Sequence, residues 1–373
     1  MRRAVLAAAA GALGVSGSAA AGPWQATLEA GAEADSNVQR TETVPEGARR
    51  IAAPVGHAGA RIDLKEGLGG GACVLNLSGL ARMVAHDQAR DENVMLYAGQ
   101  ARWLRPVAAR QIDAGVSLTA ADAFAITGGV GARTFRNLGG DGVLALGDRD
   151  GGRLTLAVGG RDFRYKPDHA FDWRGAAANA RLDLVLWRPD DNTRSLELAT
   201  TLAFEARRYR GVALTDACAP GGPVDHCAAA TTLIRRDRYQ RANVELAWTG
   251  DVVITAGYQV TVIDSNSYGQ SLYRHRVMVA ATAELPGKLF GTAIATLQID
   301  QYPDGVLVAK DVQRQEFTNL DDENRSSLQI RIARELSPAW SIEARAAVWR
   351  DFGHEDTMAF RRELISTGVI YAR

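Results

Sequence analysis

The sequence has no long apolar run beyond its first 21 residues, and it has no excess charge of either sign. A membrane-spanning helix needs roughly 18 or more consecutive apolar residues, and no segment after Ala21 approaches that length. Lys and Arg together number 43, as do Asp and Glu, and only four of the basic residues are lysines. The first absence excludes a helical membrane protein. The second gives no reason to expect nucleic acid or an anionic surface as a partner.

The first 21 residues are typical of a secretory signal peptide. Arg2 and Arg3 supply a charged start, a short apolar run follows, and small residues at 19–21 form a cleavage site. We therefore expect a leader at 1–21 and a single mature domain at 22–373. Removing the two leader arginines leaves 41 basic and 43 acidic residues. The residue directly after the expected cleavage site is Gly22 and not cysteine, which argues against a lipid-anchored lipoprotein.

What the mature chain does contain is an alternation of apolar and polar residues. In 24–35, one parity carries Trp24, Leu28 and alanines, whereas the other carries Glu29, Glu33 and Asp35. Successive side chains of a β-strand point to opposite faces, so this segment has one apolar and one hydrated face. Many later segments repeat the pattern. Together, the leader and this alternation predict an all-β, transmembrane, antiparallel up-and-down barrel. We expect it in the outer membrane of a Gram-negative bacterium, where its outer face contacts outer-membrane lipid. A soluble β-protein with tryptophans in its core is the alternative.

The predicted strands are separated by alternating short turns and longer polar loops. The expected strands are 24–37, 53–65, 72–85, 94–105, 110–119, 124–136, 153–165, 173–187, 194–209, 233–248, 252–264, 272–284, 288–300, 325–335, 339–351 and 358–372. A further apolar piece at 142–146 leaves the region 86–152 ambiguous. Both chain ends should lie in the periplasm, which requires an even number of strands. The sequence therefore predicts 16 or 18 strands.

Parity divides the strand residues into two sets. The lipid-facing set includes Leu182, Leu184, Leu198, Leu202 and Ile254, with an aromatic girdle of Trp24, Trp103, Trp248, Trp340 and Tyr371. The other set is rich in charged residues of both signs. We assign it to the lumen, because a charged side chain facing lipid at the bilayer midplane would cost a few kcal/mol. The residues predicted to line the lumen are Glu29, Glu33, Asp35, Arg61, Asp63, Arg102, Arg133, Arg153, Arg181, Asp183, Glu197, Glu205, Arg207, Arg241, Glu245, Arg276, Arg331 and Arg345.

Cysteine and histidine offer few candidate sites. Cys218 and Cys227 lie in a Gly/Pro-rich loop, where an oxidising compartment favours a loop-closing disulfide. His226 adjoins Cys227, but three candidate ligands without a fourth make a poor zinc site. The six histidines are scattered, so the sequence predicts no metal, no cofactor and no catalytic residues. Ser271 and His275 are the one pair that would test an enzyme.

The leader, the alternation and the first strand, which closes in Glu33-Ala-Asp-Ser-Asn-Val38, together resemble Gram-negative outer-membrane β-barrels. The strongest resemblance is to barrels that pass secreted polysaccharide. It implies an export pore with a hydrated lumen, fed by periplasmic export or envelope proteins. The chain departs from that pattern at its end, where Val369-Ile-Tyr-Ala-Arg373 replaces the terminal aromatic residue read by the assembly machinery.

Three functions are therefore considered. The first is an outer-membrane pore for export or passage of a polar solute, with a secreted polysaccharide as one candidate cargo. The lumen residues are of mixed sign, which argues against strong ion selectivity. The second is a structural or adhesive barrel in a surface complex, for example in motility or adhesion, with a lumen plugged by its own side chains. The third, a barrel enzyme, is the least favoured.

Overall fold

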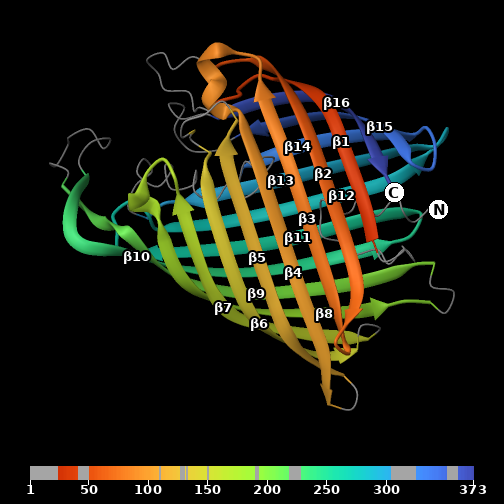
Figure 1. Cartoon of the computed structure of the whole chain (residues 1–373), viewed down its shortest axis with the longest axis horizontal. Helices are drawn as coiled ribbons and strands as arrows, with labels where there is room; N and C mark the ends of the chain where they lie inside the picture. The colour runs from red at the N-terminus through yellow and green to blue at the C-terminus, as the bar shows by residue number, and fades with distance from the viewer. Residues whose placement is uncertain are drawn as a thin grey trace.

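The chain forms a closed antiparallel barrel of 16 strands in a computed structural model (Figure 1). The structure describes residues 24–40, 50–108, 111–126, 131, 133–148, 151–189, 193–217, 228–303, 325–350 and 360–373. The predicted leader at 1–21 lies outside these residues, as do Cys218, His226 and Cys227. Within the described residues no helix is long and apolar enough to cross a membrane.

Each strand pairs with its neighbours in sequence, and the first pairs with the last. The strands are β1 (Trp24–Asp35), β2 (Ala53–Leu68), β3 (Gly71–Val84), β4 (Val94–Ala108), β5 (Ile112–Ala125), β6 (Phe135–Asp148), β7 (Gly152–Tyr165), β8 (Trp173–Trp187), β9 (Ser195–Asp216), β10 (Ala228–Thr249), β11 (Val252–Ser265), β12 (Leu272–Leu285), β13 (Leu289–Gln301), β14 (Ser326–Glu335), β15 (Trp340–Arg350) and β16 (Arg361–Ala372). Two short 3-10 helices, η2 (Asp87–Glu92) and η3 (His169–Phe171), lie in connections. The β1–β16 pairing, from Thr27 with Ala372 to Asp35 with Leu364, closes the barrel.

The two ends of the barrel differ in their connections. Both chain termini lie at one end, which we call the turn end (Figure 1). There Gly69 and Gly70 join β2 to β3 with φ values of 59° and 74°. A two-residue hairpin turn of this kind needs positive φ at both central positions, which glycine adopts without strain. The opposite, loop end carries the longer connections. In outer-membrane barrels the short turns face the periplasm and the longer loops face outward.

The predicted strands around 110–152 are corrected by the structure. The segments 110–119 and 124–136 are not two strands: β5 runs through Ala125, and β6 begins at Phe135 and includes the 142–146 piece. The outward positions of β6 include Gly140 and Gly142, which give no hydrophobic signal. The alternation of apolar and polar residues is therefore visible only near the end of this strand. The count of 16 agrees with the lower of the two predicted numbers.

Candidate functional site

The outer face of the wall is apolar and is bordered by aromatic rings. Exposed outward residues of the middle of the wall include Leu118, Val158 and Leu202, which are 58%, 67% and 58% exposed. Trp187 stacks on Trp248 at the turn end, with 5.7 Å between ring centroids. Tyr97 and Phe124 contact each other near the loop end, with 5.7 Å between centroids. An even-stranded closed barrel with such a band and two girdles is built for lipid, and the chain is a Gram-negative outer-membrane barrel.

The inner face of the barrel, on the opposite parity, carries the charged side chains. Among the predicted lumen residues, the exposed ones are Glu29, Arg61, Arg181 and Arg241. Those of intermediate exposure are Glu33, Asp63, Arg102, Arg153, Asp183, Glu197, Glu205, Arg207, Glu245, Arg276 and Arg331. The buried ones are Asp35, Arg133 and Arg345.

Most of these inner charges form ion pairs, either along one strand or between different strands of the wall. Arg153 donates to Asp113 at 2.6 Å, and Arg181 donates to Asp183 at 2.8 Å. Arg207 donates to Glu205 at 2.6 Å. Such pairs between partly exposed groups contribute about 0–1 kcal/mol each, so they organise the wall more than they stabilise it.

The inner charges at the loop end are buried, in contrast to those nearer the turn end. Asp35 at the end of β1 accepts hydrogen bonds from Arg82 of β3 and Arg362 of β16, each at 2.7 Å. Glu33 accepts a further bond from Arg82 at 3.2 Å. Asp35, Arg82 and Arg362 are 2%, 4% and 1% exposed. We call these four residues the seam cluster, because they join β1 and β16, the two strands that close the barrel, to β3, which lies on the far side of β2.

An aromatic band crosses the inner face of five strands at the same end. Phe163 stacks between Phe135 and Trp173, with centroid separations of 5.8 and 5.7 Å. The Arg207 guanidinium lies 4.3 Å from the Trp173 ring centroid and 3.6 Å from that of Tyr239. These rings are each 3–6% exposed. Stacking and cation–π contacts therefore fix this part of the wall as a rigid, dry surface.

The sequence did not single out this band or the seam cluster. One feature of the band can be seen in the sequence: Phe163 and Trp173 both have the parity of inward-facing residues. In the structure they are direct cross-strand partners. The strand register that brings them together is set by connection lengths, which were misassigned around residues 124–152. The seam cluster depends on Arg82 and Arg362, which were not on the predicted lumen list.

Arg133 is also corrected by the structure. It was predicted on a strand at 124–136, but it lies in the connection before β6 and forms an ion pair with Glu92 of η2. Both side chains are under 10% exposed. Burial alone would raise the pKa of the Glu92 carboxyl, but the Arg133 guanidinium, with the charges of Arg40 and Arg82 behind it, holds that pKa below its ordinary value.

The Glu92–Arg133 pair makes the stability of the loop end dependent on pH. A lowered pKa in the folded state stabilises the barrel above the unfolded-state pKa, and this contribution is lost as the pH falls through the folded-state value. We expect Glu92→Gln to lower the free energy of unfolding by roughly 1.5–3 kcal/mol at pH 7. The difference between wild type and variant, measured by denaturant unfolding, should shrink as the pH is lowered below the usual glutamate pKa. A difference that stays constant to pH 3 would contradict this role.

Ser271 and His275, the pair that would test an enzymatic function, are not joined by a hydrogen bond in the structure. The Nδ1 atom of His275 lies 2.8 Å from the Tyr258 hydroxyl, whereas the Ser271 hydroxyl accepts a bond from the Ser265 amide at 3.4 Å. Within the part of the chain that the structure describes, no group of three or more His, Cys, Asp or Glu side chains is placed to hold a metal ion.

Comparison with known proteins gives likeness of fold only. No family model and no curated protein matches the sequence. Among solved structures, a bacterial polysaccharide outer membrane secretin is 7% identical and aligns over 93% of this chain and 97% of its own, with a TM-score of 0.44. OmpF of Salmonella typhi in complex with daunomycin is 8% identical over 94% and 97%, with a TM-score of 0.46. A loop L8 deletion mutant of OmpT of Vibrio cholerae is 11% identical over 94% and 98%, with a TM-score of 0.45.

Proposed function

We propose that the barrel is a conduit for polar solutes, with its narrowest part at the loop end. The observation that carries this proposal is the gradient of exposure along the inner face. Arg61 and Arg181 have side chains 48% and 46% exposed in the turn-end half, whereas Arg82 and Arg362 at the loop end are nearly inaccessible. A hydrated, charged interior suits a polar solute, because a polar or charged group is costly to move into an apolar environment.

The mixed sign of the inner charges favours a solute that is polar but not selected by charge. Arg181 and Asp183 stand side by side on β8, and Glu245 of β10 lies across β9 from them. A secreted polysaccharide, delivered by periplasmic export or envelope proteins, fits such a lining and is the candidate cargo implied by the sequence resemblance. A structural or adhesive barrel in a surface complex is the competing proposal, and it requires no conduction.

Cysteine substitution tests conduction through the inner face. Arg241 is an exposed inward residue of β10, and Val244, three residues along, faces lipid with 46% of its surface exposed. In a background whose native cysteines are replaced by serine, we expect Arg241→Cys channels in planar bilayers to lose most of their conductance when a bulky, charged thiol reagent is added. Val244→Cys is the matched control and should keep its conductance.

The alternative functions give different results in the same assay. A folded, heat-modifiable barrel that conducts in neither variant contradicts the conduit and favours the structural role. Conductance that is blocked equally at both positions contradicts the assignment of the inner face. For the cargo, a deletion strain that exports its surface polymers normally, while the purified barrel conducts, excludes polysaccharide and leaves a small polar solute.

A further inference from the structure

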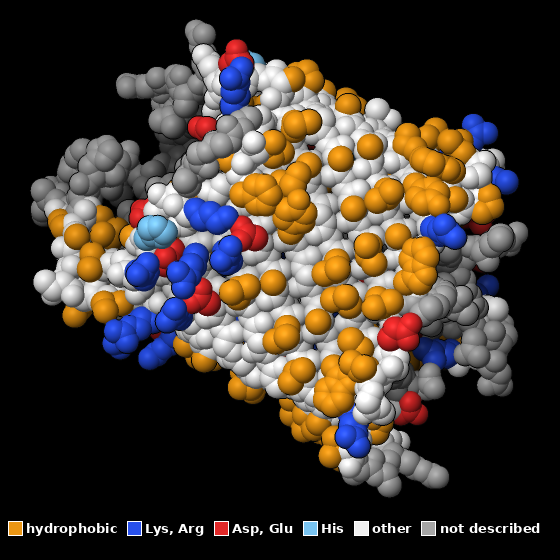
Figure 2. Space-filling model, in the orientation of Figure 1, with side chains coloured by type: hydrophobic (Ala, Val, Ile, Leu, Met, Phe, Trp, Pro, Cys, Tyr) orange, Lys and Arg blue, Asp and Glu red, His pale blue; other side chains and the backbone are white. Residues whose placement is uncertain are grey.

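The outer wall at the loop end carries a concentration of arginines, on the face that the fold otherwise gives to lipid. Figure 2 shows basic and acidic side chains gathered at this end of the wall. We call Arg136, Arg164, Arg174, Arg208 and Arg236 the arginine patch; they lie on β6 to β10 and are exposed. On each strand they share the parity of the lipid-facing residues, such as Leu138, Val158, Leu182, Leu202 and Val244.

The strand register opposes these arginines directly. Arg136 is the cross-strand partner of Arg164. Arg208 is the partner of Arg174 on one side and of Arg236 on the other. Like charges directly opposite on a sheet destabilise it. An anion held between the guanidinium groups relieves this repulsion.

The carboxylates of the wall neutralise only part of this charge. Asp122 accepts hydrogen bonds from Arg136 at 2.8 Å and from Lys166 at 2.6 Å. Asp162 accepts bonds from Arg164 at 3.0 Å and from Arg174 at 2.7 Å. Among the described residues, no carboxylate lies within ion-pair distance of Arg208 or Arg236. Two carboxylates thus serve six cations, and the excess calls for a ligand with more than one negative charge.

The patch stands at the level of lipid headgroups. From Ala176 to Trp187 the outward residues of β8 are apolar. At about 3.3 Å per residue this stretch is roughly 36 Å long, and at a tilt of about 35–45° it spans a little more than the apolar band of about 25 Å. Arg174 lies immediately beyond it. Because the loop end faces outward, the arginines meet the headgroups of the outer leaflet.

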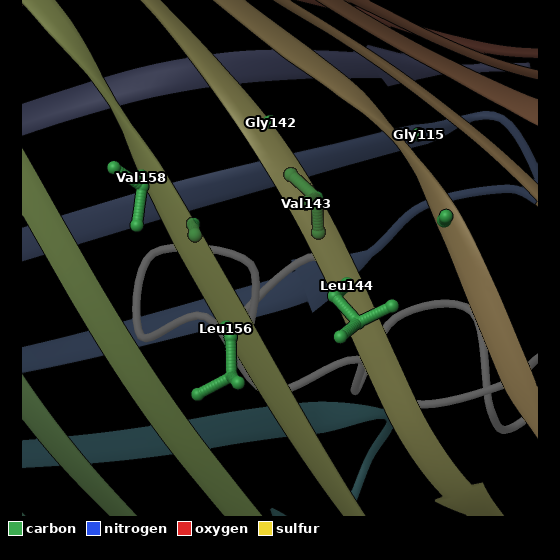
Figure 3. Close-up of a pocket in the computed structure, with 8 residues that line it drawn as sticks. Gly115, Gly142, Val143, Leu144, Leu156 and Val158 are labelled. Carbon is green, nitrogen blue, oxygen red and sulfur yellow. The ribbon is translucent and has the colours of Figure 1, made fainter.

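Below the patch the outward positions of the wall carry small residues. The outward positions under Arg136, Arg164 and Arg174 include Gly140, Gly142, Gly160, Ala176 and Ala178. A shallow apolar depression continues this strip between β5, β6 and β7, where Gly142 lies among Leu144, Leu156 and Val158 (Figure 3). It begins six residues from Arg136 along β6, which is roughly 20 Å at the rise of a strand. An acyl chain whose headgroup lies on the arginines can run along this strip, past Leu138, into the depression.

We propose that this face binds one phosphorylated glycolipid of the outer leaflet, a lipopolysaccharide, through its phosphate groups on the arginine patch and an acyl chain in the depression below. Charge complementarity supports the assignment, since guanidinium groups bind phosphate oxygens in pairs. On the opposite side of the barrel, at the loop end of β16, Arg361 also faces an arginine, Arg350 of β15, but there Glu363 pairs with Arg361. The inference is independent of whether the lumen conducts.

The test compares the intact barrel with Arg174→Gln/Arg208→Gln/Arg236→Gln and with Arg361→Gln as the matched control. Native mass spectrometry in detergent measures binding of bis-phosphorylated lipid A, monophosphorylated lipid A, phosphatidylglycerol and inorganic pyrophosphate. We expect the triple variant to bind the bis-phosphorylated lipid at least tenfold more weakly than wild type, and the control to be unchanged. Wild type should bind the monophosphorylated form and phosphatidylglycerol more weakly.

Thermal unfolding separates loss of binding from loss of folding. In lipid-free detergent the triple variant should melt at or above the wild-type temperature, because three opposed charges have been removed. On addition of bis-phosphorylated lipid A only wild type and the control should be stabilised. Equal stabilisation of all three proteins would overturn the proposal, as would pyrophosphate binding as tight as that of the lipid, which would indicate a site for free anions.

Discussion

Asp35→Asn is expected to lower the free energy of unfolding of the barrel by about 3–5 kcal/mol, the cost of removing one partner from a buried ion pair. Asp35 is the carboxylate shared by Arg82 and Arg362, and all three side chains are nearly inaccessible. Its loss leaves two guanidinium groups buried beside each other at the β1–β16 seam. Denaturant unfolding of the refolded barrel, followed by tryptophan fluorescence, measures the change.

Asp63→Asn is the matched control for the seam cluster. Asp63 also pairs with an arginine on the inner face, but Arg61 and Asp63 have side chains 48% and 24% exposed. The same substitution there should cost less than about 1 kcal/mol. In the Asp35→Asn background, Arg362→Met should recover part of the loss because it removes an uncompensated buried charge. Equal effects of the two asparagine substitutions, or no recovery, would contradict the role of the seam cluster.

Leu202→Arg is expected to impair assembly by about 2–4 kcal/mol, the cost of an arginine facing lipid at the bilayer midplane. Leu202 lies near the middle of the part of β9 that faces the bilayer, between Ala180 and Ala242 on the neighbouring strands, and is 58% exposed. The barrel should fold slowly or incompletely into lipid vesicles. The fraction of protein that runs as the compact form in unheated gels measures this.

Asn243→Arg introduces the same side chain at the same height on the inner face. Asn243 lies on β10 opposite Thr201 and Gln259. Because this position faces the interior, an arginine there should be tolerated with little loss of the compact form. Comparable losses at Leu202 and Asn243 would show that the two faces are wrongly assigned.

Much of the wall could be predicted from parity, because a strand exposes alternate residues to different surroundings wherever it lies in the barrel. Most predicted strands correspond to strands of the structure, and the even count follows from both termini lying at one end. The failures at 110–152 arose where outward positions are glycine, as at Gly140 and Gly142, so that lipid-facing residues carry no hydrophobic signal. The predicted disulfide between Cys218 and Cys227 lies outside the described residues and stays a prediction.

The arginine patch illustrates why composition alone gave no sign of an anionic partner. The chain has equal numbers of basic and acidic residues, so the sum conceals where they lie. Arg174, Arg208 and Arg236 are separated by 34 and 28 positions in sequence, but pairing of β8, β9 and β10 places them in one row. Only the register gives this row its excess charge.

The sequence by itself determined the fold class and the two faces of the wall, because both follow from local alternation of side chains along extended chain. Tertiary structure alone decided which residues meet across strands: Asp35 with Arg362, 327 positions apart, Phe163 with Trp173, and Glu92 with Arg133. The physical reason is that strand register depends on the lengths and geometry of the connections and on closure of the barrel, neither of which is encoded in the alternation. Clusters of side chains from several strands could therefore be identified only in the closed barrel.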